Sequence, residues 1–305
     1  MPIVRTDVPM TAALCSETIL ALVAEYPFCR TQLLTTTAYD RSIRTLVIGN
    51  GKRKVLYTAA HHANEWITAT VLLKFAEEFA EAIRSGGQIF GVDARHLAEQ
   101  TTIYTVPMVD PDGVDLVTGA ILPGQLQYEA AARLAENYPT IPFPDGWKAN
   151  LLGVDLNLQY PAGWPQAREI KFSQGFTRPG PRDYVGRAPL NQLESRALAE
   201  FTEFIDPELV LAYHTQGRAI YWQFQDIVVP GARELGERFA QVSGYTLEDV
   251  PYESGFAGYK DWFIKIFHRP GYTIEAGTGT NPLPLSQFKE IYRDNLGILV
   301  TAATG

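Results

Sequence analysis

Short apolar runs alternate with longer amphipathic segments along most of this 305-residue chain. Runs rich in β-branched and aromatic residues predict strands, whereas apolar residues that recur every three to four positions predict helices. Strands are predicted at residues 44–48, 55–59, 102–106, 209–213, 219–224 and 272–275. Helices are predicted at residues 11–26, 67–83, 128–138, 191–205, 232–242 and 285–303. A capping box of Asn191 and Glu194 is expected to start the fourth helix.

This alternation favours an α/β fold, with a mostly parallel, mixed and twisted sheet that carries helices on both faces. No repeat, low-complexity tract or change of composition marks a linker, so we predict a single domain over residues 1–305. Residues 1–43 are expected to form a helical lead-in packed on that domain. Residues 140–187 are rich in Pro, Gly and Asn and have little periodicity. Long loops of this kind in a compact domain are usually functional or ordered by their own packing.

Residues with metal-binding chemistry follow two of the predicted strands. His62 and Glu65, three residues apart in His61-His62-Ala63-Asn64-Glu65, come directly after the first of these strands, and His214 ends another. Imidazole and carboxylate together suit a divalent metal, zinc above all. Parallel strands bring their carboxyl ends to one crevice, so the three side chains can meet there. Taken alone the motif is weak, because a single histidine after a strand is more often a core or rim residue.

Composition narrows the classes of partner. The net charge is -8 and no cluster of Lys or Arg occurs, which argues against nucleic acid and anionic membranes as partners. No apolar run reaches 18 residues, and the apolar run 18–24 lies between Glu17 and Glu25 without a basic segment before it. We therefore expect no transmembrane segment and no signal peptide, and a cytoplasmic protein.

The two cysteines, Cys15 and Cys29, are expected to be unpaired. Across a continuous helix they would lie roughly 20 Å apart, whereas a disulfide needs Cα atoms within about 7 Å. Free thiols suit a reducing compartment.

Several motifs in a fixed order add to these observations. The strings HHANEWIT, DPDGVDLVTG, GVDLN, LAYHTQG and GYTIEAG follow one another between residues 44 and 281. In this order they resemble the zinc carboxypeptidase family. The resemblance implies one Zn²⁺ per chain, held by His62, Glu65 and His214.

The resemblance also implies roles for further residues. Asp155 would hydrogen-bond the first ligand, His62, and Glu275 would be the general base. Tyr252 would close over the substrate, and Asn157 would bind a substrate carboxylate. Each has a plainer alternative. Asp155 could cap a turn, Tyr252 could be a surface aromatic residue, and Glu275 could be a solvated carboxylate at a strand end.

The chain departs from the family pattern at two points. Leu158 stands where the family has an arginine that grips the terminal α-carboxylate, and leucine cannot make that charge-assisted pair. The arginine that stabilises the oxyanion often precedes GVDLN, where this chain has Leu151 and Leu152. Lys148 or Arg218 could provide the missing cation, and Arg218 is therefore a candidate substrate-binding residue.

One branch of the family is especially similar. The strings HANEWIT, GVDLNLQYPAGW, YHTQG and GFAGYKDWF resemble bacterial γ-D-glutamyl-diaminopimelate endopeptidases, which cut the stem peptides of cell-wall muropeptides. The resemblance implies a peptide or muropeptide substrate. Lys260 falls near the family position that shapes the leaving-group pocket, where a cation suits the distal carboxylate of meso-diaminopimelate. The alternative for Lys260 is a solvated surface lysine.

No wall-binding repeat is apparent in the sequence, which favours muropeptide recycling or wall processing in a spore. Two other functions stay open. One is a carboxypeptidase with altered specificity, and the other is an inactive zinc-bearing protein that binds muropeptides.

Overall fold

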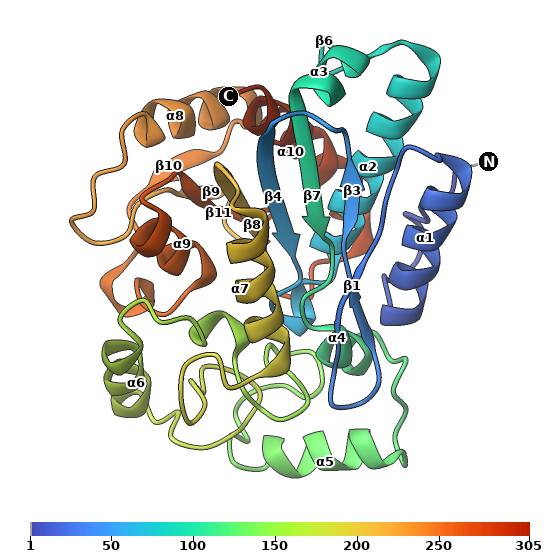
Figure 1. The fold of residues 1–305 in the computed structure, drawn as a ribbon. Coiled ribbons are helices and arrows are strands. Elements are labelled where there is room, and N and C mark those ends of the chain that lie inside the picture. Colours follow the sequence, from blue (N-terminus) through green and yellow to red (C-terminus); the bar gives the residue numbers. More distant parts are fainter. Residues whose placement is uncertain (1) are drawn as a thin grey trace.

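A computed structural model describes residues 2–305, and a twisted sheet of seven strands lies at its centre (Figure 1). In order across the sheet the strands are β10 (Thr246–Glu248), β9 (Ala219–Tyr221), β11 (Gly271–Glu275), β8 (Leu209–His214), β4 (Arg53–Ala59), β7 (Thr101–Val106) and β3 (Leu46–Ile48). Four of the six neighbouring pairs are parallel, while β11–β9 and β3–β7 are antiparallel. The mostly parallel sheet is thus confirmed.

Helices cover both faces of the sheet, as predicted (Figure 1). The side chains of β4 show why, since Tyr57 packs into one core cluster and its neighbour Leu56 into the other. The first cluster includes side chains of α1 (Ala12–Glu25), α2 (Ile67–Ser85), α3 (Ala94–Gln100), α8 (Ala232–Ser243) and α10 (Phe288–Thr304). The second includes those of α7 (Leu193–Ile205) and α9 (Tyr259–Phe267). Because both faces are covered, every residue of β8 is buried.

The N-terminal segment packs on this framework. Thr11 caps α1 by accepting a hydrogen bond from Leu14 N, and Cys15 and Cys29 are buried and unpaired, as predicted. Asp115 joins the segment to the domain, because its carboxylate accepts from Ala12 N at 2.8 Å and from Arg41 Nε. Two small hairpins complete the strands: β1 (Leu33–Thr36) with β2 (Ser42–Arg44), and β5 (Gln88–Ile89) with β6 (Val92–Asp93).

The connection from β7 to β8 runs over residues 107–208 and builds the wall of the functional site. It contains α4 (Pro111–Val117), α5 (Leu126–Ala135), α6 (Trp164–Ser173) and α7. Figure 1 shows α4, α5 and α6 beyond the carboxyl end of β4. This is the edge of the sheet where the candidate ligands lie.

Several predicted elements differ from those observed. The predicted strand 44–48 is divided between β2 and β3, and the strand 219–224 is shorter than predicted. The capping box is wrong: α7 starts after Gln192, which makes no side-chain cap, and the buried Glu194 carboxylate instead accepts from Asn150 Nδ2 at 3.2 Å. Helices α3, α4, α6 and α9 were not predicted. Among the helices of residues 2–305, none has the length and apolar character needed to cross a membrane.

Candidate active site

The candidate ligands lie at neighbouring strand ends. Ala59, the last residue of β4, is in register with Tyr213 of β8, and His214 of β8 is in register with Glu275 of β11. Beyond β4 the chain turns through a short 3-10 helix, Ala63–Glu65, that returns Glu65 towards His62. The Thr68 hydroxyl fixes this turn, since it accepts from Ala60 N at 3.0 Å and donates to Glu65 O at 2.7 Å. The backbone thereby brings all three predicted ligands to one point.

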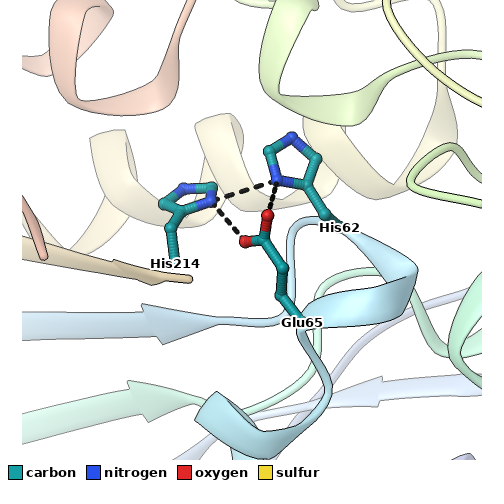
Figure 2. A group of neighbouring side chains, drawn as sticks. All are labelled: His62, Glu65 and His214. Atoms are coloured by element: carbon teal, nitrogen blue, oxygen red, sulfur yellow. Dashed lines mark hydrogen bonds and ion pairs between the residues drawn. The ribbon is translucent and has the colours of Figure 1, made fainter. Parts of the chain in front are cut away.

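Figure 2 shows the two imidazoles around the carboxylate of Glu65. Glu65 Oε1 lies 2.9 Å from His62 Nδ1, Glu65 Oε2 lies 2.9 Å from His214 Nδ1, and the two Nδ1 atoms are 3.2 Å apart. All three residues are buried, and their ligand atoms lie within 4.8 Å of one another. Two imidazole nitrogens and one carboxylate are a zinc donor set that leaves room for a further ligand. The residues therefore fit a catalytic zinc ion.

Asp155 orients His62. The His62 Nε2–H group donates to Asp155 Oδ1 at 3.2 Å, which leaves Nδ1 on the side of Glu65. Asp155 is itself held by the backbone amides of Asn157, at 3.1 Å, and Asp183, at 3.2 Å. A carboxylate behind a ligand histidine fixes its tautomer and increases its basicity.

His61 packs behind the other histidine ligand. Its ring stacks on His214 with centroids 5.6 Å apart, and its Nε2 lies 3.3 Å from the hydroxyl of Tyr160. Burial, followed by the charges of His214 and His62, holds the pKa of His61 well below its usual range. His61 is therefore a neutral packing residue.

The charges at this point favour a cation. Burial on its own would lower the pKa of His62, but the carboxylates of Glu65 and Asp155 raise it to about 9 against the opposing charge of Lys148. Burial would likewise raise the pKa of Glu65, yet His62, Lys148 and His214 hold it well below its usual range. Glu65 therefore stays ionised in the interior, where a bound cation would compensate its charge.

Two cavities adjoin beside the candidate ligands, and only the smaller one is lined by the ligands themselves. A cleft of about 260 Å³ is lined by the ligands together with Asn157, Leu158 and Lys260. A wider cavity of about 880 Å³ lies beside it, lined by residues that include Asn64, Thr215 and Asn281. Four residues line both cavities: Lys148, Arg182, Tyr221 and Glu275. A bound chain could thus extend to both sides of this junction.

Glu275 lies where the two cavities adjoin, and the pKa of its carboxyl group is raised above the usual value. Burial and then the negative charge of Glu65 raise its pKa to about 8, while Lys148 and His62 oppose the shift. A divalent ion nearby would add positive charge and lower this pKa. Glu275 is half-buried and lines both cavities beside the ligands, a position that suits a group that takes and releases a proton, and its role as general base stays a prediction.

Of the two cations named from the sequence, Lys148 and Arg218, Lys148 lies nearer the zinc ligands. Its Nζ lies 3.2 Å from Glu65 Oε1, and its backbone N–H donates to Pro181 O at 2.7 Å. Burial opposes its charge, but Glu65 and Asp155 raise its pKa, so the ammonium group stays protonated.

Three residues singled out from the sequence line the narrower cleft: Asn157, Leu158 and Lys260. Asn157 Oδ1 accepts a hydrogen bond from Tyr259 N at 3.0 Å. This bond fixes the side-chain amide of Asn157, so that the two N–H groups on its Nδ2 point away from Tyr259 N. Leu158 lies beside it, so this wall of the cleft is apolar where the family pattern has a cation. Lys260 is only 4% exposed and its Nζ contacts Gln223 O at 2.6 Å and Asp261 Oδ1 at 2.5 Å, so the alternative of a solvated surface lysine is wrong.

Two predicted residues lie outside both cavity linings. Tyr252 is 69% exposed and its ring packs edge-to-face on Phe256, so its closure over substrate stays a prediction. The role predicted for Arg218 is not supported. Its guanidinium contacts Asp294 at 2.7 Å and stacks on Tyr245, because the chain turns sharply after β8 with a left-handed backbone at Arg218 (φ 54°).

Other lining residues were missed by the reasoning from sequence. Arg182 and Asp183 lie in the aperiodic segment 140–187, and Tyr221 ends the short strand β9. The only signal for the first two was that long aperiodic loops tend to be functional. Asp261, next to Lys260, carried no signal of its own.

Comparison with known proteins agrees with this geometry. The family model described as zinc carboxypeptidase matches residues 16–297. The chain belongs to the zinc carboxypeptidase family. His62, Glu65 and His214 form the zinc site of that family, and the protein is a zinc metallopeptidase.

Two relatives span most of the chain. The chain is 42% identical over 284 residues to "Gamma-D-glutamyl-L-diamino acid endopeptidase 1" of Lysinibacillus sphaericus, covering 92% of this chain and 69% of that protein. It is 36% identical over 283 residues to the uncharacterized protein YqgT of Bacillus subtilis, covering 92% and 73%. The crystal structure of thrombin activatable fibrinolysis inhibitor shares the fold, with a TM-score of 0.77, 15% identity and coverage of 100% of this chain and 76% of that one.

We expect about one equivalent of zinc per chain, retained through dialysis. Because a catalytic zinc site needs all three protein ligands, His214→Ala should lose most of the metal in elemental analysis. His96→Ala, an exposed histidine of α3, is the matched control and should retain it. A full equivalent of zinc in His214→Ala would contradict the assigned site.

Proposed function

We propose that this metallopeptidase hydrolyses the bond between the γ-carboxyl group of D-glutamate and the following diamino acid in peptidoglycan stem peptides. The observation that carries the proposal is the 42% identity to a relative named for γ-D-glutamyl-L-diamino acid cleavage, which extends over 92% of this chain. The junction of two cavities supports an internal cut, because substrate can lie on both sides of Glu275. Leu158 supports it as well, since the cleft wall lacks the usual clamp for a terminal α-carboxylate.

In the proposed reaction Glu275 moves the proton. Zinc, when bound, supplies Lewis-acid polarisation of the carbonyl and makes water more acidic. Glu275 takes a proton from the attacking water and delivers it to the leaving amine of the diamino acid. Burial and the charge of Glu65 raise the pKa of Glu275, and a zinc ion beside it would lower that pKa, a balance that suits a proton shuttle near neutral pH.

Lys148 is proposed to stabilise the charge that develops on the carbonyl oxygen. Its half-buried ammonium group lies at the same junction as Glu275 and stays protonated beside Glu65. A preorganised cation in a site that excludes water stabilises the transition state more than the bound substrate. Lys148 would thereby replace the family arginine that is missing before Gly153.

The narrower cleft is proposed to hold the diamino acid. Asn157 offers the Nδ2 donors to a carbonyl or carboxylate next to the scissile bond. Lys260 and Asp261 form a buried ion pair in the lining, 2.5 Å apart. A group with one cation and one anion complements the distal end of meso-diaminopimelate, which carries a carboxylate and an ammonium group.

For the general base, Glu275→Gln is expected to keep zinc and fold but to reduce kcat by roughly 10²–10⁴-fold, because the amide cannot accept the proton. The measurement is the rate of cleavage of a γ-D-glutamyl peptide together with the zinc content. Glu253→Gln, an exposed carboxylate in the loop that carries Tyr252, is the matched control. Activity of Glu275→Gln within about threefold of the wild type would place the base elsewhere.

For the cation, Lys148→Met is expected to lower kcat by about 10²–10³-fold, and Lys148→Arg to recover part of that loss. Arg218→Met should stay near wild-type activity, because Arg218 lies outside both cavities. Zinc content is measured in parallel, since Lys148 contacts the ligand Glu65. If Arg218→Met loses the activity and Lys148→Met keeps it, the assignment is reversed.

For the substrate, L-Ala-γ-D-Glu-meso-diaminopimelate is expected to be cut about 10- to 100-fold more efficiently than the same peptide with L-Lys, which lacks the distal carboxylate. Lys260→Met should reduce this ratio of kcat/KM mainly by slowing the diaminopimelate peptide. Lys265→Met, on the same helix but exposed, should leave the ratio unchanged. Equal cleavage of both peptides by the wild type would remove the role of Lys260 while leaving the γ-D-glutamyl cut in place.

A further inference from the structure

Arg182 is a cation at the junction of the two cavities that the reaction described above does not use. Its side chain is 43% exposed and lines both the narrow cleft and the wide cavity, as Glu275 does. Its Nε contacts Asp183 Oδ2 at 2.6 Å. The two terminal nitrogens of the guanidinium have no hydrogen-bond or ion-pair partner among residues 2–305. These two nitrogens, at the planar end of the guanidinium group, are therefore available to a ligand.

The backbone around Arg182 is fixed to the site on both sides. The amides of Lys148 and Ala149 both donate to Pro181 O, at 2.7 and 2.9 Å. On the other side Asp183 N donates to Asp155 Oδ2, the carboxylate that orients His62. Asp183 has a left-handed backbone (φ 63°), a conformation that costs free energy in a non-glycine residue and persists only where surrounding contacts impose it. Arg182 is thus held in position relative to the zinc ligands.

The charge of the neighbouring carboxylate is already shared. Asp183 Oδ1 contacts Lys171 at 2.8 Å while its Oδ2 contacts Arg182, so one anion faces two cations. Within the part of the chain that the structure describes, Arg182 therefore shares its only carboxylate contact with a second cation, which leaves its terminal nitrogens free for an anion of the substrate. Guanidinium is the side chain best suited to grip a carboxylate with two parallel hydrogen bonds, and it stays charged at every physiological pH.

We infer that Arg182 binds the free α-carboxylate of the D-glutamyl residue on the acyl side of the scissile bond. This inference rests on the proposed function, because only a γ-linked glutamyl residue has its α-carboxylate free. That carboxylate carbon is four single bonds from the scissile carbonyl carbon, a span of roughly 5 Å. The wide cavity takes the acyl side, since the narrow cleft carries the groups for the diamino acid. Arg182, which lines both, stands where an anion close to the carbonyl must lie.

The experiment compares two peptides that differ only in this carboxylate. One is L-Ala-γ-D-Glu-meso-diaminopimelate, and the other carries the α-carboxamide, D-isoglutamine, in place of D-glutamate. The wild type is expected to cut the acid about 10- to 100-fold more efficiently, the usual effect of one charge-assisted pair. Arg182→Met should lose this factor in kcat/KM on the acid and stay within about threefold of the wild type on the amide. Arg178→Met, an exposed arginine of the same segment, should behave as wild type on both peptides.

The outcomes separate this inference from the proposed function. The inference is contradicted if the wild type cuts both peptides equally, or if Arg182→Met slows both by the same factor. In either case Arg182 does not bind the α-carboxylate, but cleavage at the γ-D-glutamyl bond still supports the proposed function. If the wild type cuts neither peptide although it holds zinc, the proposed function fails and the inference fails with it.

Discussion

The carboxylate of Glu65, held between the Nδ1 atoms of His62 and His214, is the interaction on which the site depends. His62 and Glu65 lie in the turn directly after β4, and His214 ends the parallel neighbour β8, so the register of these two strands and the turn after β4 together set the separation of the three ligands. An ionised carboxylate in the interior is stable only beside positive charge; Lys148 lies 3.2 Å from Glu65, and a bound zinc ion would compensate the charge of Glu65 directly. Burial raises the pKa of Glu275, one strand further along, and the charge of Glu65 raises it further.

The connection between β7 and β8 supplies what the sheet does not. This connection carries Lys148, Asp155, Asn157 and Arg182 to the zinc ligands. None of these four residues lies in an α-helix. These residues are held by hydrogen bonds between separate loops of the connection, not by bonds within a helix or strand. Examples are the bonds from Asp183 N to Asp155 Oδ2 and from Lys148 N to Pro181 O. Substrate recognition is thereby built on loops that a rigid sheet positions, a common division of labour in α/β enzymes.

The sequence predicted the parts of this arrangement that depend on local patterns. The strand before His62 and the strands that end at His214 and Glu275 are short and mostly apolar, and their common direction follows from the alternation with helices. Arg182 and the ion pair of Lys260 with Asp261 could not be predicted, because tertiary hydrogen bonds and burial place them. The position of Arg218 could not be predicted for a related reason, since its closeness to His214 in sequence says nothing of the turn that directs its side chain to Asp294.

The most direct test of this account is product analysis on the tetrapeptide L-Ala-γ-D-Glu-meso-diaminopimelyl-D-Ala with zinc-loaded protein. Mass spectrometry distinguishes an internal cut from the removal of a terminal residue in one measurement. The account predicts L-Ala-D-Glu and diaminopimelyl-D-Ala, since the cleft has Leu158 in place of a clamp for a terminal carboxylate and substrate can extend on both sides of Glu275. Release of D-Ala alone, with the γ-D-glutamyl bond intact, would contradict it.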